Sequence, residues 1–67
     1  MKNRIAESRK TAGLSQESLA GMLSVSRQTV IALERGKYNP SLPLAFRLAR
    51  VFNTTIEELF TDEELGP

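Results

Sequence analysis

The chain has 67 residues, which allows one domain with a small hydrophobic core. It contains no Cys and no His, so disulfides and thiolate metal sites are excluded and a metal centre is not expected. No apolar run reaches the roughly 18 residues needed to cross a membrane. The charged N-terminus MKNRIAESRK is also unlike a signal peptide, so we expect a cytoplasmic protein.

The charge is unevenly divided along the chain, although the net charge is only +1. Residues 1–50 hold all nine Lys and Arg with three acidic residues, which gives +6. Residues 51–67 hold five acidic residues and no basic one, which gives −5. This asymmetry suits a face that binds a polyanion and a second surface turned away from it. Two ordinary solvated faces would explain the charges equally well.

Helix signals begin near the N-terminus. Residues 3–12 are predicted to form a first helix, with Asn3 as its N-cap and Gly13 just past its end. A second helix is predicted over residues 16–23, with Ser15 as its N-cap. Apolar residues recur at helical spacing in both segments, so each helix has one face to bury.

A third helix is predicted over residues 27–35, with Ser26 as its N-cap and Gly36 as its stop. Only the corner Ser24-Val25-Ser26 separates it from the helix before. Two helices joined by so short a turn form a helix-turn-helix unit, whose second helix is presented to a DNA major groove.

The remaining helices are predicted over residues 42–52, capped by Ser41, and over residues 56–60, opened by Thr55. Asn53 is expected to end the fourth helix in a left-handed conformation. No segment shows the alternation of a strand, and no internal repeat is present. The predicted fold is therefore all-α.

The whole chain, residues 1–67, is expected to be a single domain. Its core is predicted to cover residues 3–60, and residues 61–67 are predicted to be an acidic tail. The sequence contains no glycine-rich phosphate loop and no acidic pair in an apolar setting, so an enzyme is not expected. A chain this small also leaves little room for an effector pocket, and no cofactor is expected.

The stretch SQESLAGMLSVSRQTVIALERGKYNPSL, with the helix before it and LAFRLARVFNTTIEELF after it, resembles the lambda-repressor-like helix-turn-helix proteins. These include the Cro and phage-repressor DNA-binding domains. The resemblance covers about residues 3–60 and combines several spaced features, including Ala20 and the SRQT that opens the third helix. It implies a compact five-helix fold and sequence-specific operator binding, usually as a symmetric dimer. The family commonly has Gly at the position of Ser24, so a positive φ there would strain the backbone by about 1 kcal/mol.

The resemblance places base contacts at Arg27, Gln28 and Ala32. Gln can pair with adenine N6 and N7, and Arg can pair with guanine O6 and N7 or hold a phosphate instead. A solvated surface amide is the alternative for Gln28. Ile31 lies on the same outward face by spacing, where it would meet a thymine methyl or pack against Met22 or the fourth helix.

Polar residues around the third helix are expected to hold DNA phosphates. Gln16 opens the second helix, where backbone N–H groups also favour an anion. The other expected phosphate contacts are Ser26, Thr29, Arg35, Lys37, Tyr38 and Asn39. The resemblance further implies an ion pair between Arg9 and Glu34 that joins the first helix to the third; two separate solvated charges are the alternative.

One module of this size reads few base pairs, so a homodimer on a palindromic operator is expected. The apolar residues predicted to form its interface are Val51, Ile56, Leu59, Phe60 and Leu65. The leading interpretation is a transcriptional regulator, most simply a repressor, that binds double-stranded DNA. An antitoxin that binds both DNA and a toxin is an alternative, and so is a protein-interaction module on the same fold.

Overall fold

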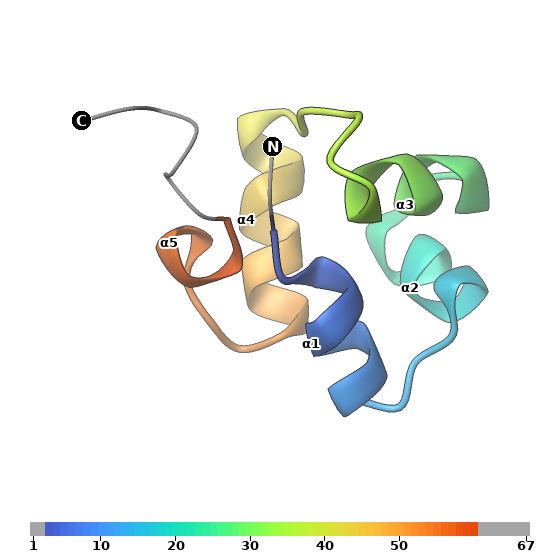
Figure 1. Cartoon of the computed structure of the whole chain (residues 1–67), viewed down its shortest axis with the longest axis horizontal. Helices are drawn as coiled ribbons and strands as arrows, with labels where there is room; N and C mark the ends of the chain where they lie inside the picture. Colours follow the sequence, from blue (N-terminus) through green and yellow to red (C-terminus); the bar gives the residue numbers. More distant parts are fainter. Residues whose placement is uncertain (1–2, 61–67) are drawn as a thin grey trace.

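The computed structural model describes residues 3–60, which form five α-helices (Figure 1). Their bounds are α1 Ile5–Thr11, α2 Gln16–Leu23, α3 Arg27–Glu34, α4 Leu42–Val51 and α5 Ile56–Leu59. Each predicted helix is present, and its ends lie within two residues of those predicted. Over residues 3–60 the only β-type pairing is one isolated bridge between Asn3 and Phe60. The all-α expectation is confirmed.

Hydroxyl side chains start four of the five helices. Each accepts a hydrogen bond from the backbone N–H three residues later, as the sequence predicts for an N-cap. The capping residues are Ser15, Ser26, Ser41 and Thr55.

The predicted cap of α1 is wrong by one residue. Arg4 occupies the N-cap position and makes no side-chain cap, although Asn3 Oδ1 accepts from the N–H of Ile5 at 3.0 Å. The nitrogen of the Asn3 side-chain amide makes a contact with a distant part of the chain. Its Nδ2 donates to the carbonyl of Leu33 at 2.7 Å, so the side chain lies between the start of α1 and the end of α3.

Four helices end in the same way, with one residue in the left-handed conformation. These residues are Gly13 (φ 75°), Ser24 (φ 58°), Gly36 (φ 71°) and Asn53 (φ 53°). At each end, the left-handed residue and its successor donate N–H groups back to carbonyls of the last helical turn. The endings predicted at Gly13, Gly36 and Asn53 are confirmed, and Ser24 adopts the positive φ that the sequence left open.

All five helices contribute to one core. The fully buried side chains are Ile5, Leu19, Leu23, Val30, Leu33, Leu48 and Leu59. Burying each side chain of this size contributes about 1.5–3 kcal/mol, which offsets part of the entropy lost when the chain orders.

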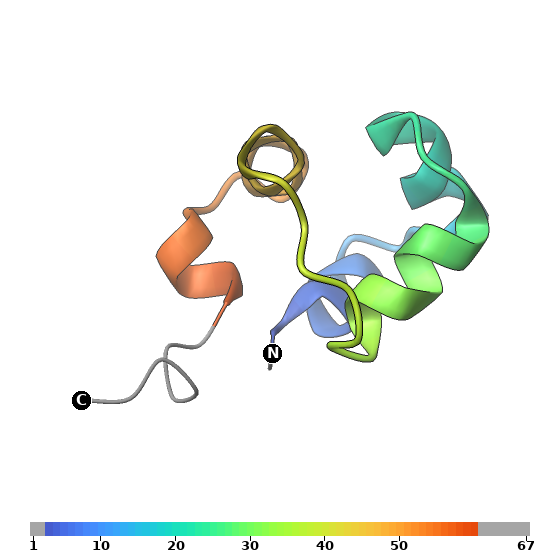
Figure 2. The same ribbon diagram turned by 90° about the horizontal axis from the view of Figure 1, so that it is seen from above.

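The helices surround this core as an open ring. In the view from above, α4 is seen nearly end-on between α5 on one side and the α2–α3 pair on the other (Figure 2). The start of the chain meets the end of α5, where the N–H of Arg4 donates to the carbonyl of Leu59 at 2.7 Å. Both ends of the described chain are thereby tied to the core.

Candidate nucleic-acid interface

The turn between α2 and α3 sets the direction of α3. The N–H of Ser24 donates to the carbonyl of Gly21 at 3.2 Å, and that of Val25 donates to Ala20 at 3.0 Å. Val25 is half-buried and packs against the core. The turn is therefore held by two backbone hydrogen bonds and by the packing of Val25. Ser24 adopts a left-handed conformation there that Gly adopts more easily.

One face of α3 points into the core and the opposite face points away from it. Val30 and Leu33 are fully buried. Arg27 and Gln28 are exposed at the N-terminal end of the helix, and Ile31 is half-buried one turn later. At 100° per residue, these three side chains and that of Ala32 fall on one contiguous outward face.

Ile31 is not anchored in the core. Among residues 3–60, the partly buried apolar side chains packed against the core are Val25, Val51, Phe52, Ile56 and Phe60. Met22, one of its suggested packing partners, is 57 % exposed. The half-buried Ile31 and Ala32 thus lie on the outward face of α3, one turn after the exposed Arg27 and Gln28.

The first turn of α3 is fixed by its own hydroxyls. Ser26 Oγ accepts from the N–H of Thr29 at 3.1 Å, and the two hydroxyl oxygens lie 3.0 Å apart. Ser26 is exposed and Thr29 is half-buried. Both residues therefore have structural roles, and each hydroxyl keeps acceptor or donor capacity for a further partner.

The segment after α3 carries the rest of the expected rim. Arg35, Lys37, Tyr38 and Asn39 are all exposed. The turn at Gly36 brings Lys37 back over the end of α3, since its N–H donates to the carbonyl of Ala32 at 3.0 Å. The cations of this rim therefore flank α3 at its C-terminal end.

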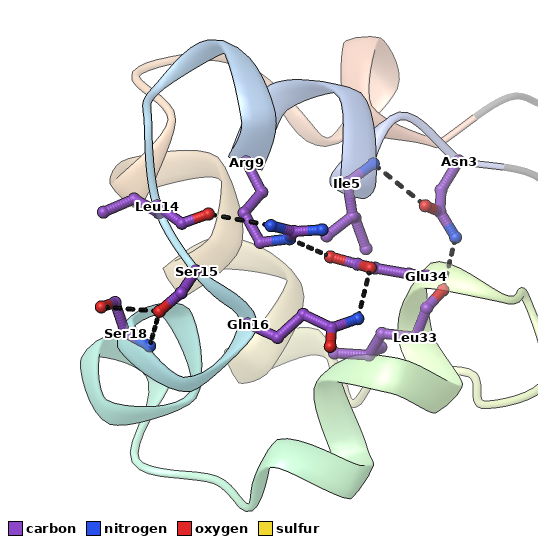
Figure 3. A network of polar contacts seen from close by, with 9 residues as sticks. All are labelled: Asn3, Ile5, Arg9, Leu14, Ser15, Gln16, Ser18, Leu33 and Glu34. Atoms are coloured by element: carbon purple, nitrogen blue, oxygen red, sulfur yellow. Dashed lines mark hydrogen bonds and ion pairs between the residues drawn. The ribbon is translucent and has the colours of Figure 1, made fainter.

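A polar network beneath this surface joins three elements (Figure 3). Arg9 Nε lies 2.6 Å from Glu34 Oε2, and the two side chains are only 13 % and 9 % exposed. Arg9 Nη1 also donates to the carbonyl of Leu14 at 2.8 Å. One guanidinium thus holds both the end of α3 and the turn before α2, a geometry that its planar fork of donors allows.

Gln16 belongs to the same network. Its Nε2 donates to Glu34 Oε1 at 3.0 Å, so both carboxylate oxygens of Glu34 are occupied (Figure 3). The sequence suggested only a phosphate contact for this residue. A primary amide has two N–H groups, so one remains for a phosphate while the other holds α3.

The expected dimer residues fall into three groups. Leu59 is 1 % exposed and is part of the core, so its assignment to an interface is wrong: the short α5 needs its one inward Leu to attach to α4. Val51, Ile56 and Phe60 are half-buried and pack against the core with part of their surface open. Leu65 lies outside the described residues.

Two exposed apolar side chains on α4 were not anticipated. Leu42 is 64 % exposed and Phe46 is 50 % exposed. The buried positions Leu44, Ala45 and Leu48 give the signal that could have identified them, because residues at 42 and 46 then fall on the opposite side of a helix.

Neither a metal site nor a membrane span is found in residues 3–60. No three His, Cys, Asp or Glu residues of this segment are grouped as metal ligands. Its helices are also too short or too polar to cross a bilayer.

The fold and the exposed α3 define a helix-turn-helix protein of the lambda-repressor-like class. Comparison with known proteins supports the same conclusion. The model of the helix-turn-helix family matches residues 5–59, and the chain belongs to this family. Its members are DNA-binding transcriptional regulators and not enzymes.

Three relatives illustrate the match. An uncharacterised helix-turn-helix transcriptional regulator of Archaeoglobus fulgidus is 55 % identical over 67 residues, covering 97 % of this chain and 96 % of its own. The cryptic phage CTXphi transcriptional repressor RstR of Vibrio cholerae is 32 % identical, covering 92 % of this chain and 56 % of its own. The crystal structure of the restriction-modification controller protein C.AhdI of Aeromonas hydrophila matches with a TM-score of 0.76 at 40 % identity, covering 85 % and 86 % of the two chains.

Proposed function

We propose that this protein is a transcriptional repressor that binds a palindromic DNA operator as a homodimer, with α3 of each copy in the major groove. The observation that carries the proposal is the exposed start of α3, where Arg27 and Gln28 project from a helix that Glu34 joins to α1 and α2. Helix-turn-helix proteins present their second helix to base edges in this way.

Base recognition falls to four side chains in this proposal. Gln28 reads adenine through N6 and N7, and Arg27 reads guanine or clamps a phosphate. Ile31 and Ala32 supply apolar contact for a thymine methyl, because both keep surface open on the same face.

Phosphate contacts flank α3 on both sides. Gln16 offers its second amide N–H together with the free backbone N–H groups at the start of α2. After the C-terminal end of α3, Arg35 and Lys37 supply positive charge and Tyr38 and Asn39 supply neutral donors. Ser26 and Thr29 supply hydroxyl groups at the start of the helix.

The small area that one copy can bury on DNA favours a dimer. One module buries roughly 600–1,000 Å² on DNA, which reads few base pairs, whereas a two-fold pair doubles the site and spaces two α3 helices one DNA turn apart. The partly exposed Val51, Ile56 and Phe60 lie in the C-terminal part of the described chain, where the pairing is proposed. The repressor role is supported by the phage transcriptional repressor RstR, which is 32 % identical to this chain over 62 residues.

The proposal is tested by selecting binding sites from a random pool of duplex DNA. The expected result is an inverted repeat with half-sites about 10 base pairs apart, whose occupation lowers transcription from an adjacent promoter. Affinity should also fall steeply with salt, because each phosphate contact releases counterions. Recovery of no enriched sequence, together with an affinity indifferent to salt, would refute the proposal.

A further inference from the structure

The side chain of Asn3 joins two helices that are far apart in the sequence. Its Oδ1 accepts from the N–H of Ile5 at 3.0 Å, at the start of α1. Its Nδ2 donates to the carbonyl of Leu33 at 2.7 Å, in the last turn of α3 (Figure 3). A primary amide carries an acceptor oxygen beside a donor nitrogen, so one short side chain serves both helix ends.

The backbone of the same segment is paired with the end of α5. The N–H of Arg4 donates to the carbonyl of Leu59 at 2.7 Å. Asn3 forms an antiparallel bridge with Phe60, the residue that follows α5. Asn3 is thus attached to the end of α5 through its backbone and to the end of α3 through its side chain.

This link differs from the network on the next residue of α3. Glu34 is held by Arg9 of α1 and by Gln16 of α2, so its contacts stay within the first three helices. The carbonyl of Leu33 instead accepts from the segment that is paired with α5. The last turn of α3 is therefore attached separately to the helices around the motif and to the C-terminal part of the described chain.

The second attachment matters for a dimer on DNA. Phe60 is one of the residues proposed to pair two copies, whereas Arg27 and Gln28 are proposed to read base edges. The orientation of α3 relative to Phe60 then determines how far apart the two α3 helices lie and how they are rotated about the DNA axis. One base pair more or less between half-sites moves one of them by about 3.4 Å and turns it by about 34–36°. A firm link between α3 and Phe60 makes that shift costly, and a loose link lets each copy adjust.

We propose that Asn3 is a positioning residue that makes the protein selective for the spacing between the two half-sites of its operator. In this role Asn3 does not touch DNA and acts through the carbonyl of Leu33. The role rests on the homodimer of the proposed function. It adds a selectivity that depends on the distance between half-sites and not on the bases within them.

Asn3→Asp separates this role from the capping of α1. The carboxylate still accepts from the N–H of Ile5, but an oxygen replaces the donor that faces the carbonyl of Leu33, and the two oxygens repel each other. The measurement is the affinity of the full chain for duplexes with the selected half-sites at the selected spacing, and at one base pair less or more. The wild-type protein should prefer the selected spacing. In Asn3→Asp this preference should fall about fivefold, the factor that one net hydrogen bond contributes to an equilibrium.

A second variant keeps the test independent of the added charge. Asn3→Ala removes both side-chain hydrogen bonds and should lose the same spacing preference, measured at a temperature where circular dichroism shows an intact fold. In both variants the base preference within each half-site should remain that of the wild type, because Arg27 and Gln28 are unchanged.

Two controls separate the link from stability and from charge. Ser41→Ala removes the hydroxyl that accepts from the N–H of Leu44 at the start of α4, so it weakens the fold without touching the link. It should lower the melting temperature and leave the spacing preference unchanged. Lys10→Gln removes an exposed positive charge on α1 and should change the affinity for all three spacings by one factor.

The outcomes distinguish the positioning role from the proposed function. An unchanged spacing preference in both Asn3 variants would overturn the positioning role and leave the dimeric repressor standing. A wild-type protein that binds an inverted repeat equally well at all three spacings would also overturn the role. Selection of a single half-site, without an inverted repeat, would refute the dimer and the positioning role together.

Discussion

Gln16 Nε2 donates to Glu34 Oε1 at 3.0 Å and so joins the first residue of α2 to the last residue of α3. The second oxygen of the same carboxylate accepts from Arg9 at 2.6 Å. The relative orientation of the two motif helices is therefore set by a polar contact at their open ends as well as by the turn at Ser24. Loss of the Glu34 carboxylate would remove the contacts that hold the end of α3 to α1 and to the start of α2.

Glu34→Ala is expected to lower the free energy of unfolding by about 2–4 kcal/mol, because it leaves a mostly buried guanidinium without its counter-charge. Urea denaturation measures this loss. Glu7→Ala removes an exposed carboxylate from α1 and should change stability by less than about 0.5 kcal/mol. Equal, small effects of the two substitutions would show that the network does not contribute to the fold.

Gln16→Ala is expected to have two separable effects. It should lower the free energy of unfolding by about 1 kcal/mol, because a half-buried hydrogen bond to a charged group is lost. It should also weaken binding to all DNA sequences by a similar factor, because the proposed phosphate donor is removed while no charge is lost. A stability loss with an unchanged DNA affinity would restrict Gln16 to its structural role.

Ser24→Gly is expected to raise the free energy of unfolding by about 0.5–1 kcal/mol, because Gly adopts the left-handed conformation at φ 58° without the steric cost of a Cβ. Ser24→Ala keeps the Cβ and should give no gain. Thermal or urea unfolding of the two variants distinguishes relief of backbone strain from a simple loss of the hydroxyl.

Gly21→Ala should also stabilise the protein, for the opposite reason. Gly21 lies inside α2, and an added Cβ would meet no atom within 4 Å. Ala is better than Gly in a helix interior by about 1 kcal/mol. Gly13→Ala has equally open space but sits at φ 75°, so it should be destabilising. Stabilisation by both substitutions would mean that the turn after α1 relaxes from its left-handed conformation.

The helices were predictable because their signals are local. Hydroxyl caps at Ser15, Ser26, Ser41 and Thr55 and the stop at Gly36 determine where elements begin and end within a residue or two. Helical spacing then separates the buried Val30 and Leu33 from the outward Arg27 and Gln28, so most of the candidate site follows from the sequence pattern.

The errors come from contacts between distant segments. Asn3 was given a local capping role, but its amide also bonds to Leu33, thirty residues away. Leu59 is predicted at an interface because it is one of several apolar residues near the C-terminal end of the chain, but it is 1 % exposed and belongs to the core of the monomer. The second role of Gln16 likewise depends on Glu34, eighteen residues away, whose position a sequence pattern does not supply.

In the proposed recognition of DNA, α3 reads base edges while the surrounding rim binds phosphates. Its most direct test compares Gln28→Ala and Lys37→Ala by measuring affinity for the selected operator and for all its single-base variants. Gln28→Ala should cost about 1–3 kcal/mol on the operator and relax preference at one position of each half-site. Lys37→Ala should weaken binding to every sequence by a similar factor. An unchanged base preference in Gln28→Ala would contradict the account, because recognition would then not pass through the exposed face of α3.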